Sequence, residues 1–143
     1  MNLTEKPGQL ASHLREQARH LEGLRILVAE DDSVNQLVIG NFFQIAGVVF
    51  EMVKNGQEAV ELMKKQDFDL VLMDVHMPVM DGLTATRQIR QDPKLRKIPI
   101  LALTAGVTRE EKDKALDAGL NDFIVKPFDH LTLLDTLTRW VRT

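Results

Sequence analysis

Residues 70–82 read LVLMDVHMPVMDG, and this stretch decides the fold. Four apolar residues lead to Asp74, and turn-forming residues follow before a helical pattern begins at Leu83. An apolar run of this length, bounded by turn residues, indicates a strand buried on both faces, as in a parallel sheet. Asp74 then stands at the carboxyl end of a central strand, which is the edge where open α/β sheets bind ligands. A lone aspartate there is more often a local turn residue, so the other strand ends must be compared.

Three further predicted strands also end in polar residues. The residues at these ends are Glu30, Asp31, Asp32, Thr104 and Lys126. Because the carboxyl ends of parallel strands share one edge of a sheet, we expect these carboxylates, the hydroxyl and the ammonium to converge on Asp74.

Strands and helices alternate along the chain from Arg25. Strands are predicted over 26–30, 48–53, 70–74, 98–104 and 123–125, and helices over about 33–46, 56–66, 82–90, 109–118 and the segment after Pro127. Right-handed crossovers then place helices on both faces of a parallel sheet. The fold class is therefore α/β, a doubly wound (βα)5 flavodoxin-like domain with the sheet order 2-1-3-4-5.

Two of these helices have a predicted apolar face. The helix over 33–46 has Ser33 as its expected cap and an inward face made of Val34, Leu37, Val38, Phe42 and Ile45. The last helix is expected to turn inward Leu131, Leu134, Leu137 and Val141. The helix over 109–118 has few large apolar residues, so we expect it to be the most mobile.

Residues 1–24 precede the first strand and are predicted to form a linker and a short amphipathic helix, with the main domain over 25–143. Met1 to Gly8 are polar, and Leu10, Leu14, Ala18 and Leu21 then recur at helical spacing up to Gly23. Two interpretations stay open: the helix packs on its own domain, or it is a linker helix of a longer protein.

Composition excludes several function classes. The net charge of -3 gives no general basis for binding nucleic acid, and the absence of cysteine rules out disulfides and thiolate metal sites. Apolar runs are far shorter than the roughly 20 residues that span a bilayer, and residues 1–24 lack a signal-peptide core. A cytoplasmic location without membrane contact is the expectation.

The converging groups suggest a chemistry. Clustered carboxylates either raise a pKa or bind a cation, and oxygen ligands without histidine or cysteine favour Mg²⁺. With the cation bound, Asp74 is placed to attack phosphorus and form an aspartyl phosphate. Thr104 and Lys126 are then available to contact phosphoryl oxygens. The side chain of His76 is interpreted as part of a turn.

The sequence closely resembles the receiver domain of two-component response regulators. The resemblance covers about residues 25–142 and rests on LVAEDDS at 27–33, MDVHMPVMDG at 73–82, LTA at 103–105 and VKPF at 125–128. It implies that Asp74 accepts a phosphoryl group from a phosphohistidine. It also implies that Asp31 binds Mg²⁺ directly, Glu30 through water, and His76 through its main-chain carbonyl. Many members have aspartate where this chain has Glu30.

Further roles follow from the same resemblance. Thr104 matches the switch hydroxyl, Phe123 the switch aromatic residue, and Lys126 the phosphate-binding lysine, which is expected to precede a cis peptide bond to Pro127. Phosphorylation would draw Thr104 inward and let Phe123 fill the vacated space. The domain would catalyse its own phosphorylation and dephosphorylation without being a kinase itself.

The local sequence over 29–36 looks most like receivers of hybrid sensor histidine kinases, which would make this chain the cytoplasmic part of such a protein. The expected partner is a histidine kinase core or a histidine phosphotransfer domain. A free-standing single-domain response regulator is the alternative. A phosphatase of the haloacid dehalogenase type is disfavoured because His76 stands where that class needs a second aspartate. A pseudo-receiver that serves only as an interaction module would normally lack one of the key residues.

Overall fold

The structure, a computed structural model, describes residues 7–141 and, among these, the side chains from Ser12 onward. Residues 1–6, which belong to the predicted linker, and the last two residues, 142 and 143, lie outside this part of the chain.

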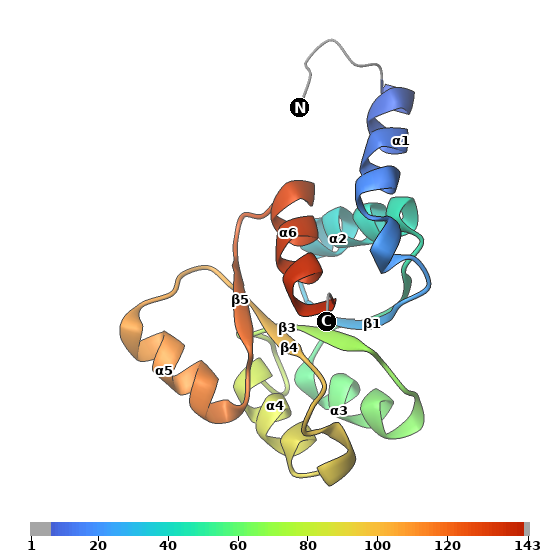
Figure 1. Ribbon diagram of the computed structural model, residues 1–143. Coiled ribbons are helices and arrows are strands. Elements are labelled where there is room, and N and C mark those ends of the chain that lie inside the picture. Colours follow the sequence, from blue (N-terminus) through green and yellow to red (C-terminus); the bar gives the residue numbers. More distant parts are fainter. Residues whose placement is uncertain (1–6, 142–143) are drawn as a thin grey trace.

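Parallel strands form one sheet at the centre of the molecule (Figure 1). They are β1 (Arg25–Ala29), β2 (Val49–Val53), β3 (Leu70–Asp74), β4 (Ile100–Thr104) and β5 (Asp122–Val125). Their order is β2-β1-β3-β4-β5, which confirms the predicted doubly wound topology. β3 pairs with β1 and β4 and is buried at every position, because it has a strand on each side and helices on both faces.

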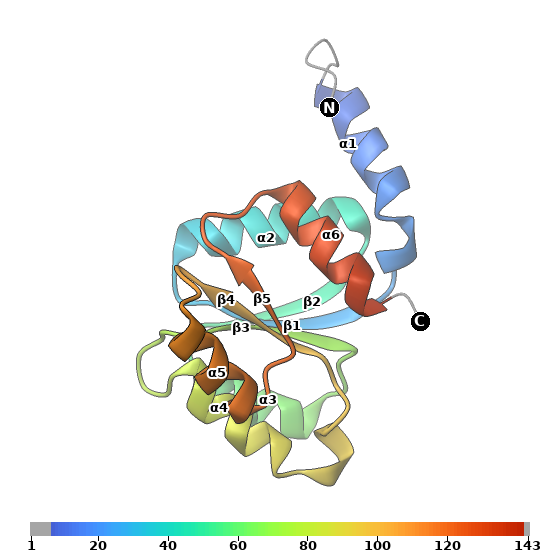
Figure 2. The same cartoon turned by 60° about the vertical axis from the view of Figure 1, so that its left-hand side comes forward.

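Helices cover both faces of this sheet (Figure 2). On one face lie α1 (Pro7–Gln17), the short 3-10 helix η1 (Arg19–Leu21), α2 (Ser33–Ala46) and α6 (His130–Val141). On the other lie α3 (Gly56–Lys65), α4 (Gly82–Arg90), the 3-10 helix η2 (Pro93–Leu95) and α5 (Arg109–Ala118). Within residues 7–141, no helix is long and apolar enough to cross a membrane.

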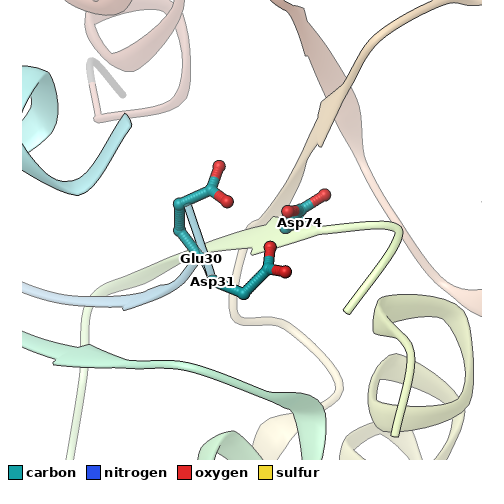
Figure 3. Close-up of side chains that lie close together, drawn as sticks. All are labelled: Glu30, Asp31 and Asp74. Atoms are coloured by element: carbon teal, nitrogen blue, oxygen red, sulfur yellow. The ribbon is translucent and has the colours of Figure 1, made fainter. Parts of the chain in front are cut away.

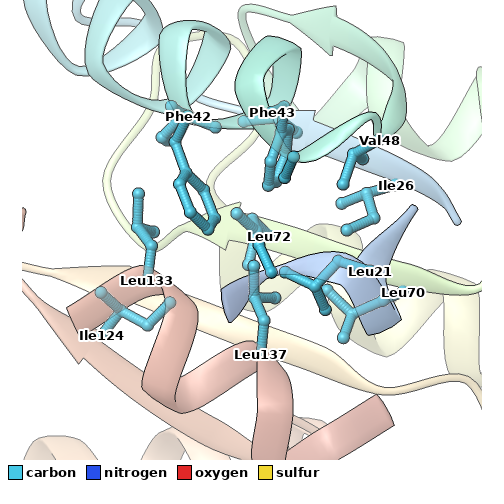
Figure 4. Packing of buried hydrophobic residues seen from close by; sticks show 14 of the residues in the cluster. Leu21, Ile26, Phe42, Phe43, Val48, Leu70, Leu72, Ile124, Leu133 and Leu137 are labelled. Atoms are coloured by element: carbon cyan, nitrogen blue, oxygen red, sulfur yellow. The ribbon is translucent and has the colours of Figure 1, made fainter. Parts of the chain in front are cut away.

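Each face of the sheet has its own hydrophobic core. On the side of α2 and α6, Phe42 and Phe43 pack toward Leu72, Leu133 and Leu137 (Figure 4). The other core brings alanines from three helices against the sheet, namely Ala59, Ala85 and Ala115. α5 buries only Ala115 and Ala118 of its residues, so its predicted weakly apolar face is confirmed, and its mobility stays a prediction.

The predicted inward faces of α2 and α6 were partly wrong. Val34 and Leu37 are 65% and 64% exposed, whereas Ile39 and Phe43 are fully buried. α2 carries two neighbouring apolar stripes, and the stripe with the aromatic pair meets the sheet, where Phe43 lies 5.5 Å from Phe50 between ring centroids. In α6, Leu137 is buried as predicted, but Leu131 is 52% exposed and Leu133 takes its place in the core.

The predicted cap of α2 was also wrong, by one residue. Asp32 rather than Ser33 has the extended backbone of a cap, and its Oδ1 atom accepts the Val34 N–H at 2.8 Å. Gly47 ends the helix in a left-handed conformation.

The N-terminal segment packs on its own domain. Leu14, Ala18 and Leu21 are buried against the core shared by α2 and α6. That the same helix is a linker helix of a longer protein stays a prediction. α1 begins at Pro7, inside the stretch predicted as linker, and gives way to η1 after Gln17. The Leu10 side chain lies outside the described part of the structure, so its predicted place on the apolar face of α1 stays a prediction.

Candidate functional site

Two strands carry acidic residues to one point at the carboxyl edge of the sheet (Figure 3). Asp74 ends β3, and Glu30 and Asp31 directly follow β1, which pairs with β3 in parallel register. One carboxylate oxygen from each of these three residues lies within 4.8 Å of the others. Glu30 and Asp74 are buried, whereas Asp31 is exposed. The predicted convergence is confirmed for these three acids, whereas Asp32, which was predicted to join them, is outside this group and caps α2.

Lys126 brings the positive charge to this cluster. Its Nζ atom lies 2.9 Å from Glu30 Oε1 and 3.0 Å from Asp74 Oδ2. The peptide bond between Lys126 and Pro127 is cis, as the resemblance implied. One ammonium therefore faces two buried carboxylates, with the third carboxylate of Asp31 at the solvent side.

Burial and charge act in opposite directions on these groups. Desolvation and the hydrogen bond with Asp74 raise the pKa of Glu30, although Lys126 and the Asp32 N–H favour its ionised form. Desolvation alone would lower the pKa of Lys126, but the neighbouring carboxylates of Glu30 and Asp74 raise the pKa on balance. Lys126 is thus held charged while Glu30 resists ionisation.

The site has the donor set that a hard cation needs. Three carboxylates against one ammonium leave a surplus of negative charge when all are ionised. Although Glu30 Oε1 is near Lys126, the geometry is not that of a hydrogen bond, and this buried atom has no hydrogen-bond partner among the described residues. Buried oxygen acceptors beside an exposed carboxylate fit Mg²⁺, which keeps several of its waters. Asp31, Glu30 and Asp74 are the side chains that would hold it.

Thr104 and Phe123 come from the neighbouring strands β4 and β5, and the Thr104 carbonyl accepts the Lys126 N–H at 2.7 Å. Thr104 ends β4, whose neighbouring Leu103 is in register with Asp74. The Thr104 hydroxyl donates to the carbonyl of Gly106 at 2.9 Å. The Phe123 side chain is partly buried, and Lys112 Nζ lies 6.0 Å from its ring centroid.

Two glycines beside the loop after Asp74 have a structural role that the sequence analysis did not assign: Gly56 at the start of α3 and Gly82 at the start of α4. A Cβ atom on Gly82 would lie 2.1 Å from the Asp74 carbonyl oxygen, and one on Gly56 would lie 2.6 Å from the Met80 carbonyl oxygen. Both glycines thus let the chain pass closely behind the acidic cluster. The Asp81-Gly82 pair before a helix was the available signal for Gly82, but nothing local marked Gly56.

Backbone hydrogen bonds hold the first turn of the site. The N–H of His76 donates to Asp74 Oδ1 at 3.1 Å, which turns this carboxylate toward the loop. Gln36, which was not predicted to take part, donates from Nε2 to the Glu30 carbonyl at 2.6 Å. The metal contact expected from the His76 carbonyl stays a prediction.

A protein-family model and several known proteins match this chain. The model described as response regulator receiver domain matches residues 26–138. The hybrid signal transduction histidine kinase M of Dictyostelium discoideum is 41% identical over 121 residues, which cover 81% of this chain and 5% of that protein. The histidine kinase BarA of Escherichia coli is 34% identical over 82% of this chain and 13% of its own length.

Solved structures show the same fold. The receiver domain of the sensor histidine kinase PA1611 from Pseudomonas aeruginosa, solved with a magnesium ion in its active-site cleft, is 40% identical in sequence. The TM-score is 0.79, and the match covers 85% of this chain and 99% of that one. The receiver domain of Saccharomyces cerevisiae Ssk1, solved with the phosphotransfer protein Ypd1, is 33% identical with a TM-score of 0.78, covering 84% and 90%. The chain spans only a small part of the curated relatives cited above.

Proposed function

This chain belongs to the family of response regulator receiver domains, and we propose that it takes a phosphoryl group from a phosphohistidine onto Asp74. The observation that carries the proposal is the placement of Lys126 within 3.0 Å of Asp74 beside the acidic cluster. A carboxylate at a strand end, an ammonium and a cation-binding donor set are together the parts that phosphoryl transfer to an aspartate requires.

The residues divide the chemistry as follows. A carboxylate oxygen of Asp74 attacks phosphorus, the phosphorus–nitrogen bond of the phosphohistidine breaks, and the imidazole leaves with that electron pair. Asp31, Glu30 and Asp74 would hold Mg²⁺, which would supply positive charge to offset that of the phosphoryl oxygens near the carboxylates. Lys126 exchanges its contact with the Asp74 carboxylate for one with a phosphoryl oxygen, so its positive charge stays compensated.

Thr104 and Phe123 would couple the phosphorylation of Asp74 to a change at the surface of the domain. The Thr104 hydroxyl now donates to Gly106, so it must leave this contact before it can donate to a phosphoryl oxygen. That exchange pulls on the chain between β4 and α5. Inward movement of Phe123 would part it from Lys112. The output of the domain is then a changed surface over α5, β5 and α6.

We favour a hybrid sensor histidine kinase as the parent protein, with a histidine kinase core or a phosphotransfer domain as the partner, in the cytoplasm. Support comes from relatives that are named hybrid kinases and from the Ssk1 receiver solved with a phosphotransfer protein. A free-standing response regulator is the alternative for the parent.

The test is the intact mass of the chain after incubation with Mg²⁺ and acetyl phosphate. We expect a gain of one phosphoryl group that needs Mg²⁺ and is lost in Asp74→Asn. Asp31→Asn should weaken Mg²⁺ binding and slow the gain, and its folding can be checked by circular dichroism. A folded chain that gains no mass with either acetyl phosphate or a phosphohistidine protein would instead be an interaction module.

A further inference from the structure

The two acids that follow β1 lie beyond the end of its pairing with β3. That pairing ends at Ala29 and Met73, and the carbonyl of the next residue, Glu30, accepts a hydrogen bond from the Gln36 side chain of α2. The distance between Gln36 Nε2 and this carbonyl oxygen is 2.6 Å. A side chain of the next helix thus holds a peptide group at the carboxyl edge of the sheet.

The peptide group that Gln36 contacts joins Glu30 to Asp31. Glu30 is fully buried and Asp31 is exposed, yet one carboxylate oxygen of each lies within 4.8 Å of one on Asp74 (Figure 3). Because a peptide group is planar, a hydrogen bond to its carbonyl fixes the orientation of the whole unit. The directions in which Glu30 and Asp31 leave the main chain are fixed with it. One hydrogen bond from Gln36 therefore acts on two of the three carboxylates.

The first turn of α2 also holds the Glu30 side chain. The Asp32 N–H donates to Glu30 Oε2 at 3.1 Å, and the Gln36 N–H donates to the Asp32 carbonyl at 3.0 Å. The same helical turn therefore holds Glu30 at its carbonyl and at one carboxylate oxygen. The other oxygen, Oε1, stays buried without a hydrogen-bond partner among the described residues. Hydrogen bonds from residues that are not ligands themselves commonly orient the ligands of a metal in this way.

We infer that Gln36 is a positioning residue for the cation site, because it fixes the peptide group between Glu30 and Asp31 before Mg²⁺ binds. The inference rests on the proposed function, which needs this cation, and it adds a residue outside the acidic cluster. Gln36 supplies no ligand; its amide keeps two carboxylates turned toward Asp74. Without this hydrogen bond, Mg²⁺ would have to order the peptide group as it binds, so the affinity for Mg²⁺ falls although the ligands are unchanged.

The experiment measures the affinity of the unphosphorylated full chain for Mg²⁺, by following its amide signals in an NMR titration with Mg²⁺. Gln36→Met keeps nearly the same size but has no donor, and we expect Mg²⁺ to bind about tenfold more weakly. Gln57→Met is the matched control, because Gln57 lies in the first turn of α3, is partly buried and donates from Nε2 to the exposed Glu61 at 3.0 Å. It should keep the wild-type affinity.

A second pair of variants separates the hydrogen bond from a loss of packing. Gln36→Lys restores a donor of similar length, and Leu37→Lys adds the same charge at a neighbouring exposed position without that hydrogen bond. The Mg²⁺ affinities of these two variants should agree within about twofold. If Gln36→Lys instead binds Mg²⁺ tenfold more weakly than Leu37→Lys, the hydrogen bond is not the cause. Gln36→Asn, whose amide is too short to reach, should resemble Gln36→Met and replaces it if the methionine variant does not fold.

Labelling of Asp74 by acetyl phosphate distinguishes this inference from the proposed function. For Gln36→Met the labelling rate should fall about tenfold at low Mg²⁺ and return to within about twofold of wild type at saturating Mg²⁺, because a weakened cation site is then filled again. A wild-type Mg²⁺ affinity, or a labelling rate that stays low at saturating Mg²⁺, would overturn the inference and leave the proposed function intact. If the wild-type chain neither binds Mg²⁺ nor gains a phosphoryl group, the proposed function is wrong and the inference with it.

Discussion

Only glycine fits at position 82, because a side chain there would collide with the backbone of Asp74. Its Cβ position would meet the Asp74 carbonyl oxygen and carbon, which are backbone atoms of the central strand and cannot move aside. Gly82→Ala should therefore destabilise the fold by roughly 3 kcal/mol and lower the labelling of Asp74, as measured by urea unfolding and intact mass. Gly106→Ala is the control, because no atom lies within 4 Å of its Cβ position. Equal stability of the two variants would contradict the described path of the loop.

Glu30 should make stability depend on pH. Its pKa in the folded chain is raised above the ordinary value of 4.5 by burial and by Asp74. Between these two values the folded state binds more protons than the unfolded state, so the free energy of unfolding falls as pH rises through this window. We expect this fall in urea titrations without Mg²⁺, and a smaller fall with Mg²⁺ bound. The Glu30→Gln variant should show no such fall in the free energy of unfolding. The Glu61→Gln variant, changed at an exposed position of α3, should show the same fall as the wild type.

Among single residues, those proposed to react were predictable from the sequence, whereas those that shape the surrounding backbone were not. Asp74 ends β3, Glu30 and Asp31 follow β1, and Lys126 follows β5. The rule that the carboxyl ends of parallel strands share one edge was therefore enough to bring them together. Gly56 depends on a backbone approach between segments far apart in sequence, which no local pattern records. The positive φ of Val79 is imposed by the loop against the preference of valine, so its sequence gave no sign of it.

For whole helices, the sequence was likewise insufficient to predict which apolar face is buried. Periodicity in α2 predicts that an apolar stripe is buried, but this helix has apolar residues on two neighbouring stripes. The stripe with Ile39 and Phe43 is the one buried against the sheet, because the Phe43 ring packs over β1 and β2 next to Phe50. The other stripe, with Val34 and Leu37, is left at the carboxyl edge of the sheet.

The start of α6 should depend on the Asp129 carboxylate. Its Oδ1 atom accepts both the N–H and the hydroxyl of Thr132 at 2.9 Å, which lowers the pKa of Asp129. Asp129→Ala should cost about 1 kcal/mol at pH 7 by loss of this cap. A lowered pKa gives stability above the ordinary value of 3.8 that is lost as pH falls through the folded value, so the difference from wild type should shrink in acid. Asp129→Asn, which can still cap, should cost less in the same urea titrations.

For the whole molecule, alternation of strands and helices was enough to predict the architecture. Apolar strands bounded by turns require a sheet buried on both faces, and short connections then leave a doubly wound sheet as the common solution. The attachment of the N-terminal segment was not predictable, because the same amphipathic pattern suits a helix docked on its own domain and one docked elsewhere. The deciding fact is tertiary: Leu21 lies in the core beside Leu70 and Leu137.

This packing makes the predicted boundary between residues 24 and 25 testable. Leu21 is fully buried, the Gly23 N–H donates to the Gly47 carbonyl at 2.9 Å, and His20 Nε2 lies 2.7 Å from Thr138 Oγ1 on α6. Leu21→Ala should lower the free energy of unfolding by about 2–5 kcal/mol, whereas His13→Ala, on the exposed side of α1, should change it little. A chain of residues 25–143 should lose at least as much as Leu21→Ala. If it unfolds at the same urea concentration as the full chain, the N-terminal helices are an attachment to the receiver domain and not part of its folding unit.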